Sequence, residues 1–190
     1  PVSGTIAMGG LPVHQIDPVS YRRLFGTAFR DESFFFGTIR ENLCLQRPDA
    51  TESEVLEAAR MGGALDWIKL LPSSFGSVLG EAGQGLSSGQ RQTLALSRAF
   101  LGTPGAIILD EPTSDLDART EAEFVMRLRS LPKDTTLVVV THRPAVLDAC
   151  NRLIVLDQGS VLLDGEKTLV LARLKQIVHS QRSAAAEASG

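Results

Sequence analysis

A chain of 190 residues is long enough to bury one sizeable core and short of the length at which two independent domains are expected. Hydrophobic residues make up 43% and charged residues 22%, which is typical of a globular protein and excludes a disordered or fibrous one. The formal net charge of −3 gives no general attraction to phosphate backbones, so we expect no nucleic-acid partner.

Two cysteines, Cys44 and Cys150, lie far apart and outside any Cys/His cluster. This pattern favours free thiols in a reducing compartment over a disulfide framework. No apolar run approaches the ~20 residues that cross a bilayer, so we expect any membrane-spanning part outside this sequence. The start, residues 1–4, has no signal-peptide pattern and is interpreted as a point inside a larger protein.

The first half of the chain divides into two predicted regions. Residues 4–29 carry short apolar stretches separated by glycines, which predict a small β-rich edge with a strand at 5–8 and a helical turn at 18–24. Between residues 38 and 100 apolar side chains recur at helical spacing, interrupted by the glycine-rich stretch 80–85. We therefore predict an inserted helical subdomain over about residues 38–100.

Beyond Pro104 buried apolar runs alternate with helical patterns. The predicted elements are strands at 106–109, 136–140 and 153–156, and helices at 118–129 and up to Ala149. Strands that alternate with helices indicate a mainly parallel core sheet covered on both faces, which is an α/β fold. A hairpin strand at 161–163 after a turn at Gln158 and Gly159, a last helix at 167–178 and a disordered, low-complexity tail at 181–190 complete the prediction.

Two adjacent carboxylates, Asp110 and Glu111, follow the apolar strand at 106–109. Ligands of parallel sheets collect at the carboxyl ends of the strands. Asp110 therefore stands where the Mg²⁺ of a nucleoside triphosphate could be held, and Glu111 where an attacking water could be polarised. On these residues alone, a strand end solvated by two acidic side chains is an equal alternative.

Two further segments carry residues that could take part in the same chemistry. Ser87 and Ser88 precede a helical stretch through Phe100, so their hydroxyls and free N–H groups would form an anion site at a helix N-terminus, or only an N-cap. His142 follows the apolar strand at 137–140 and so lies at the same edge as Glu111. A lone histidine at such a place is more often structural.

In this order, the segments resemble the ABC ATPase family over nearly the whole chain. Residues 86–90 (LSSGQ) are similar to the family signature LSGGQ, with Ser88 in place of the first glycine. This resemblance implies that the signature segment contacts the γ-phosphate of ATP bound to a partner subunit. The residues concerned are Ser87, Ser88, Gly89 and Gln90.

The remaining family motifs can be matched in the same way. Residues 107–111 look like the Walker B strand, which implies a catalytic role for Glu111 and metal binding for Asp110. Residues 114–117 look like the D-loop, with Asp117 as a nucleotide-binding candidate. His142 looks like the switch histidine, which in the family touches the γ-phosphate and helps orient the attacking water.

Two segments resemble stretches that are found in the exporter cassettes of this family. Residues 36–43 (FGTIRENL) are similar to the exporter stretch FxGTIxENI, and residues 79–83 (LGEAG) to the X-loop that meets the coupling helices of the membrane domain. We therefore expect the Glu81 loop and the region from Arg30 to Glu41 to contact a transmembrane domain, although an ordinary loop carboxylate is the alternative for Glu81. Residues 85–174 look most like bacterial type I secretion and related peptide or toxin exporters.

The chain departs from the family pattern at two points. The phosphate-cradling P-loop needs G-x-x-x-x-G-K-[ST], but the nearest approach is residues 165–168 (GEKT), which we interpret as a turn. Residues 1–6 resemble the family segment after the P-loop helix, which implies that the P-loop lies upstream.

Arg30 stands where the Q-loop of the family has glutamine. A guanidinium only donates hydrogen bonds, so metal ligation at this position is in doubt. Pairing of Arg30 with phosphate or with Glu111 stays open.

Taken together, the resemblance implies a cassette that uses ATP and Mg²⁺, works as a head-to-tail dimer with a second copy, and drives export at the cytoplasmic face of the bacterial inner membrane. The alternatives are a soluble ABC ATPase without a transport role and a degenerate cassette without turnover. Residues 1–190 alone are expected to bind MgATP weakly or not at all and to show no ATPase activity, because the P-loop is missing.

Overall fold

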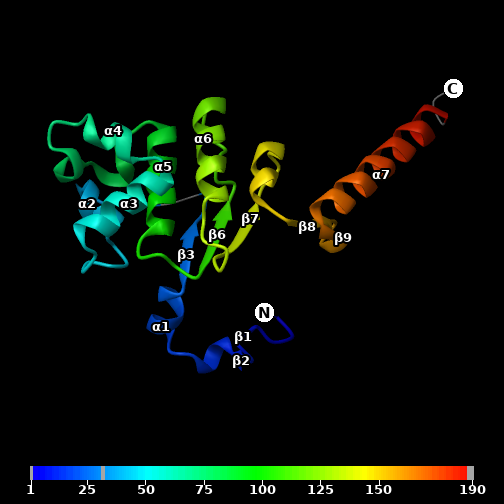
Figure 1. Cartoon of the computed structure of the whole chain (residues 1–190), viewed down its shortest axis with the longest axis horizontal. Coiled ribbons are helices and arrows are strands. Elements are labelled where there is room, and N and C mark those ends of the chain that lie inside the picture. The colour runs from blue at the N-terminus through cyan, green and yellow to red at the C-terminus, as the bar shows by residue number, and fades with distance from the viewer. Residues whose placement is uncertain (1, 31–32, 188–190) are drawn as a thin grey trace. The chain divides into compact units, whose positions relative to one another are not determined.

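The computed structural model describes residues 2–30 and 33–187, which fall into two compact units, Pro1–Val146 and Leu147–Gly190 (Figure 1). Within the described residues, no helix has both the length and the apolar character needed to span a bilayer.

The larger unit is built on a three-stranded parallel sheet. Its strands are β3 (Phe25–Ala28), β6 (Ala106–Asp110) and β7 (Thr136–Val140), in the order β3-β6-β7. The central strand β6 has strands on both sides, and its Ile107 and Leu109 are fully buried. Because all three strands run the same way, their carboxyl ends meet at one edge, as the predicted α/β fold requires.

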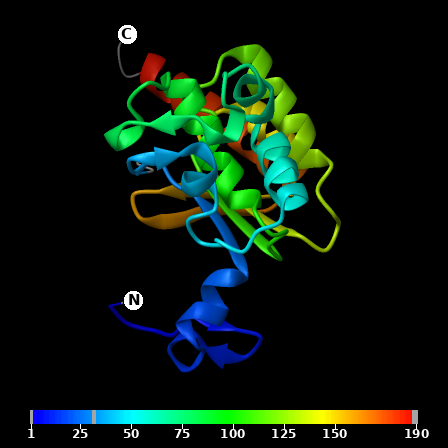
Figure 2. The same cartoon turned by 90° about the vertical axis from the view of Figure 1, so that its left-hand side faces the viewer.

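The interval 38–100 is mainly helical, as the sequence predicts. It holds α2 (Ile39–Leu43), α3 (Glu52–Gly62), α4 (Leu65–Lys69) and α5 (Ser88–Phe100) (Figures 1 and 2). A short antiparallel pair, β4 (Gly37–Thr38) and β5 (Val78–Leu79), and the 3₁₀ turns η2 (Ser74–Gly76) and η3 (Glu81–Gly83) lie among these helices.

Capping boxes fix where three of these helices begin. Thr38 and Glu41 at α2, Thr51 and Glu54 at α3, and Ser87 and Gln90 at α5 each exchange side-chain and backbone hydrogen bonds. In such a box the first side chain accepts from the backbone N–H three residues on, and the side chain there accepts in return. The helix starts are thus determined by local sequence.

Helix α5 joins the helical region to the sheet, since it packs against both α3 and β3. The approach to β3 is close enough to require glycine: a Cβ atom on Gly26 would lie 1.7 Å from the carbonyl oxygen of Ala99. Helix α6 (Ala118–Arg129) adds the fully buried Phe124, whose ring lies edge-on to Phe100 at 6.2 Å.

The N-terminal segment forms the small β-rich element that the sequence predicts. Strands β1 (Ala7–Met8) and β2 (Leu11–Pro12) pair antiparallel as a hairpin. They are followed by a 3₁₀ turn, η1 (Val13–Gln15), and by α1 (Pro18–Arg23), which Asp17 caps.

The smaller unit corrects two sequence predictions. The sequence groups 153–156 with the parallel strands, but β8 (Arg152–Asp157) belongs to a separate two-stranded sheet. The predicted hairpin is confirmed, since β8 pairs antiparallel with β9 (Ser160–Glu166). The two residues between them, Gln158 and Gly159, have φ values of 46° and 77°, and two left-handed residues make the tight turn that favours local antiparallel pairing.

The second correction concerns the C-terminal tail, which the sequence predicts to be disordered over residues 181–190. Helix α7 (Lys167–Glu187) continues through most of that stretch, and residues 188–190 lie outside the described part. Its alanines have the highest intrinsic helix propensity, which explains the continuation. The predicted helix up to Ala149 is the 3₁₀ segment η4 (Pro144–Ala149), at the boundary of the two units.

The close approach at Gly26 gives a first prediction. Gly26→Ala should lower the free energy of unfolding by about 3 kcal/mol, because the added methyl group must displace the backbone of α5. Gly105→Ala is the matched control, since a Cβ atom there meets nothing within 4 Å. Urea unfolding of both variants measures the difference, and equal stabilities would contradict this account of the α5 and β3 contact.

Candidate functional site

Glu111 lies directly after β6 in a left-handed backbone conformation, with φ of 47°. Its N–H donates to the carbonyl of Val140 at 2.8 Å, so the residue is held against the end of β7. Such a conformation costs about 1–3 kcal/mol for a residue with a side chain and recurs at functional sites. Here it turns the chain sharply at the edge where the parallel strands end.

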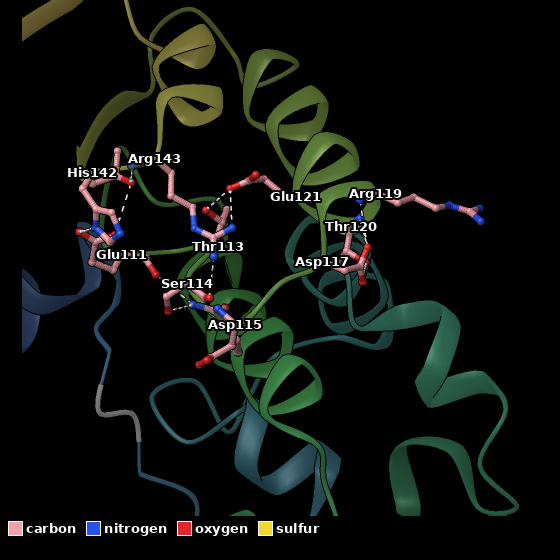
Figure 3. Close-up of polar contacts among 12 residues, drawn as sticks. Glu111, Thr113, Ser114, Asp115, Asp117, Arg119, Thr120, Glu121, His142 and Arg143 are labelled. Carbon is pink, nitrogen blue, oxygen red and sulfur yellow. Dashed lines mark hydrogen bonds and ion pairs between the residues drawn. The ribbon is translucent and has the colours of Figure 1, made fainter.

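The carboxylate of Glu111 and the imidazole of His142 form a close pair (Figure 3). The Oε1 atom of Glu111 lies 2.7 Å from Nδ1 of His142, while Oε2 accepts a long hydrogen bond of 3.5 Å from the hydroxyl of Thr141. The Glu111 side chain is 18% exposed and that of His142 77%. With Nδ1 directed at the carboxylate, Nε2 is the ring nitrogen left for another partner.

Asp110 and Arg30 line one small pocket of about 100 Å³, together with Ser88, Gln92 and Asp115. The pocket therefore combines the end of β6, the residues after β3 and the first turns of α5. A guanidinium beside the proposed metal-binding carboxylate adds positive charge where glutamine would supply a neutral acceptor. Arg30 is thus suited to an anionic ligand of the pocket.

The donor set limits how a metal could be held. Among the described residues, no group of three or more His, Cys, Asp or Glu side chains could hold a metal ion. A single carboxylate such as Asp110 fits Mg²⁺ when phosphate oxygens and water supply most of the ligands, which is the usual arrangement in nucleotide sites. The residues present therefore fit a metal that arrives with a triphosphate.

The signature segment begins α5 with a capping box. Gln90 N–H donates to the hydroxyl of Ser87 at 3.2 Å, and Ser87 N–H donates to Oε1 of Gln90 at 3.0 Å. The N-cap interpretation of Ser87 is thus confirmed. The N–H groups of Ser88 and Gly89 lie in the same first turn, where α-helices favour negative charge.

Asp117 caps the next helix, α6. Its Oδ1 accepts from the N–H groups of Arg119 and Thr120, both at 3.0 Å, and its Oδ2 accepts from the Thr120 hydroxyl at 2.8 Å. These bonds, with the Thr120 N–H first, lower the pKa of the Asp117 carboxyl below its usual 3.8. The carboxylate predicted to contact nucleotide is therefore engaged in the cap.

Gln92 and Arg143 are functional candidates that the sequence reasoning missed. Gln92 contacts Glu111, Ser114 and Asp115, and Arg143 contacts Ser114. Gln92 lies two positions after the signature segment and Arg143 immediately after His142, but their partners are 19 to 29 residues away. No local pattern in the sequence indicates such distant contacts.

The segments expected to meet a membrane domain lie side by side. Strand β4 pairs with β5, with Gly37 opposite Leu79, and Ala82 N–H donates to the carbonyl of Phe34 at 3.1 Å. Phe36 and Val78 expose 70% and 61% of their surface beside the Glu81 loop. Two stretches separated by about 40 residues thus form one partly apolar surface.

Comparison with known families decides the identity. A model of the ABC transporter family matches residues 1–114, which is more than half of the chain. The chain belongs to the ABC transporter family. This confirms the resemblance to the family, and the matched range includes the signature and Walker B segments.

Individual members of the ABC transporter family are similar over most of the chain. The uncharacterized ABC transporter ATP-binding protein YknV of Bacillus subtilis (strain 168) is 36% identical over 90% of this chain and 28% of its own length. The β-(1→2)glucan export ATP-binding/permease protein NdvA of Rhodopseudomonas palustris (strain BisA53) is 38% identical over 95% of this chain and 31% of its own length. The chain thus spans about 30% of these relatives.

A solved structure agrees with the fold of this ABC transporter chain. A bacterial Atm1-family ABC exporter with ATP bound superposes with a TM-score of 0.83 at 30% identity, covering 90% of this chain and 30% of the exporter chain. The α/β fold with its parallel sheet is thereby confirmed.

The cap at α6 gives a second prediction. Asp117→Ala should lower the melting temperature at pH 7, because two backbone N–H groups lose their acceptor. The folded-state pKa is lowered, so this stabilisation is fully present above pH 3.8 and is lost as the pH falls through the folded-state pKa. Thermal unfolding between pH 7 and pH 3 should show the two proteins converging.

Asp49→Ala is the control for this experiment, since Asp49 is exposed and lies in a turn outside the helices. It should leave the melting temperature nearly unchanged across the same range. A constant difference between wild type and Asp117→Ala at every pH would contradict a charged cap.

Proposed function

We propose that the chain is part of the ATP-binding and ATP-hydrolysing cassette of an ABC exporter, coupling MgATP hydrolysis to transport across the bacterial inner membrane. The observation that carries the proposal is the Glu111 and His142 pair at the carboxyl end of the central strand. The names of the relatives support the same activity, since NdvA is an export ATP-binding/permease protein and the Atm1-family exporter has ATP bound.

Each catalytic side chain has a proposed task. The Oε2 atom of Glu111 orients and polarises the attacking water, because Oε1 is engaged by His142 and, among the described residues, Oε2 has only the 3.5 Å bond from Thr141. The Nε2 atom of His142 binds a γ-phosphate oxygen. Asp110 holds Mg²⁺, and the ion neutralises charge on the phosphates when bound.

The residues present fit one half of a nucleotide site. They supply the metal carboxylate, the water-orienting carboxylate and the histidine, but the sequence has no G-x-x-x-x-G-K-[ST] loop to cradle the phosphates. We therefore propose that the chain acts inside a full-length protein in which a phosphate-cradling segment completes the site. Relatives about three times as long as the matched region are consistent with this arrangement.

The second copy of the cassette is the proposed partner for the signature segment. The N-terminus of α5 presents the exposed Ser88 and the half-buried Gly89, which are suited to a γ-phosphate on a facing subunit. A head-to-tail dimer would place Ser87, Ser88, Gly89 and Gln90 of each copy over the nucleotide of the other. Asp117 would support this contact by holding the start of α6.

The transmembrane domain is the second proposed partner. The surface formed by the Glu81 loop and residues 33–41 has exposed aromatic and aliphatic side chains, Phe36 and Val78, next to a carboxylate. An exposed apolar patch of this kind is typical of protein contact sites. A cassette docked in this way would work at the cytoplasmic face of the membrane.

The competing functions receive less support. The relatives named above include exporters, which disfavours a soluble ABC ATPase without transport. A degenerate cassette would not need the paired Glu111 and His142. The narrower assignment to type I secretion stays a prediction, since the relatives named above include a glucan exporter.

The role of Glu111 generates a third prediction. In the full-length protein, Glu111→Gln should bind MgATP as tightly as wild type, hydrolyse it about 100-fold or more slowly, and elute as an ATP-dependent dimer, because only the water-orienting charge is removed. Steady-state hydrolysis and size-exclusion chromatography measure these effects. Glu52→Gln, an exposed position on α3, is the control and should retain wild-type turnover; wild-type turnover in Glu111→Gln would contradict the proposed function.

The docking surface generates a fourth prediction. Glu81→Ala in the full-length transporter should leave basal ATP hydrolysis within about twofold of wild type while export falls, because Glu81 lies on the exposed loop after β5 and away from Glu111 along the chain. Transport into inverted membrane vesicles and ATPase assays on the same preparation separate the two activities. An equal loss of both would identify a structural role for the loop instead.

A further inference from the structure

The peptide group between Ser114 and Asp115 is held at both ends by side chains from distant parts of the chain. Its carbonyl accepts from Nη2 of Arg143 at 2.8 Å, and its N–H donates to Oε1 of Gln92 at 2.7 Å. The carbonyl and the N–H of a trans peptide point in opposite directions, so the two side chains approach from opposite sides. Figure 3 shows Arg143 directed at this segment, which corresponds to the D-loop.

Gln92 reaches beyond this peptide to Glu111. Its Nε2 donates to the carbonyl of Glu111 at 2.9 Å and to the Ser114 hydroxyl at 3.1 Å. Both amide hydrogens of Gln92 and one of the two lone pairs of its amide oxygen are thus engaged in hydrogen bonds. Because Gln92 belongs to α5, one side chain ties the signature helix to the backbone of the proposed catalytic residue.

Arg143 makes the corresponding link on the other side. Its Nη1 lies 3.3 Å from Oε1 of Glu121 on α6, and the hydroxyl of the buried Thr113 donates to the same oxygen at 2.6 Å. The side chains of Arg143 and Glu121 are 31% and 13% exposed, so this ion pair is partly shielded from water. Since Arg143 follows His142 directly, the residue that fixes the peptide also fixes the histidine-bearing turn.

We infer that Gln92 and Arg143 are positioning residues that clamp the Ser114–Asp115 peptide and so make the placement of Glu111 depend on the signature helix. The inference rests on the proposed ATP hydrolysis and goes beyond it. Glu111 has a left-handed backbone with its N–H bound to Val140 and its carbonyl bound to Gln92. A strained residue keeps its conformation only when its surroundings hold it, so loss of the clamp should move the carboxylate.

The first test measures the clamp directly in the 190-residue chain. Asp115 is exposed, so its amide should exchange with solvent quickly unless Gln92 protects it. Gln92→Met and Arg143→Met should therefore increase deuterium uptake in fragments covering residues 111–117, measured by mass spectrometry. The matched controls, Gln46→Met and Arg129→Met, remove the same side chains at exposed positions and should leave uptake there unchanged.

A second variant separates the two halves of the Gln92 amide. Gln92→Glu keeps an oxygen for the Asp115 N–H but loses the donor to the Glu111 carbonyl. Uptake at residues 111–117 should therefore stay closer to wild type than in Gln92→Met, while hydrolysis should still fall. Unchanged uptake in both Gln92→Met and Arg143→Met would overturn the inference.

The second test uses hydrolysis by the full-length protein. Gln92→Met and Arg143→Met should each lower kcat about tenfold or more with the Kd for MgATP within about twofold, because a misplaced carboxylate slows the chemical step. Both side chains hold one peptide, so the double variant should lose much less than the product of the single losses. A double variant whose loss in kcat equals the product of the two single losses would overturn the positioning role, and so would an unchanged kcat in the single variants.

Failure of the proposed function can be told apart from failure of the clamp. If the wild-type full-length protein hydrolyses no ATP, the proposed function is wrong, whereas the exchange measurements still decide whether the clamp exists. Arg143→Lys adds a check on mechanism: lysine keeps the charge but replaces the two separate Nη donors by one nitrogen, so kcat should lie between wild type and Arg143→Met.

Discussion

The parallel register of β6 with β7 is the constraint on which the rest of the candidate site depends. Pairing of Asp110 with Val140 ends both strands at one level, so the residues that follow, Glu111 and Thr141 to Arg143, leave the sheet next to each other. The hydrogen bond from Glu111 N–H to the Val140 carbonyl extends this pairing by one step. A shift of one residue in this register would separate the carboxylate from the imidazole by moving one side chain to the other face.

Hydrogen bonds to the backbone connect this edge to the helices around it. Gln92 from α5 and Arg143 from the turn after β7 meet at the Ser114–Asp115 peptide, and Glu121 joins α6 to the same cluster. A partly buried network of this kind is stiff only while every member has its partner. The signature segment, the D-loop segment and the proposed catalytic pair are therefore linked by short, specific contacts rather than by general packing.

Two capping residues show how a local structural role and a proposed functional role fall on the same segment. Ser87 begins α5 and Asp117 begins α6, and each uses its side chain to bind N–H groups of its own helix. The caps fix where the helix N-termini lie, which in turn orients the free N–H groups of Ser88 and Gly89. In the candidate site, binding would then depend on backbone groups that the caps hold in place more than on the cap side chains themselves.

The sequence by itself determined the family, the α/β class, the helical region at 38–100 and the position of Asp110, Glu111 and His142 at one edge of the sheet, because strand patterns, capping boxes and motif order are local properties. The sequence also predicted the hairpin turn at Gln158 and Gly159, but it wrongly grouped residues 153–156 with the parallel sheet and wrongly predicted a disordered tail. Only the tertiary structure revealed the contact of Glu111 with His142, the shared pocket of Arg30 and Asp110, and the clamp by Gln92 and Arg143. The hydrogen bonds among these join residues 19 to 31 positions apart, and the pocket brings together residues 80 positions apart; only the packing of strands and helices makes such distant side chains neighbours.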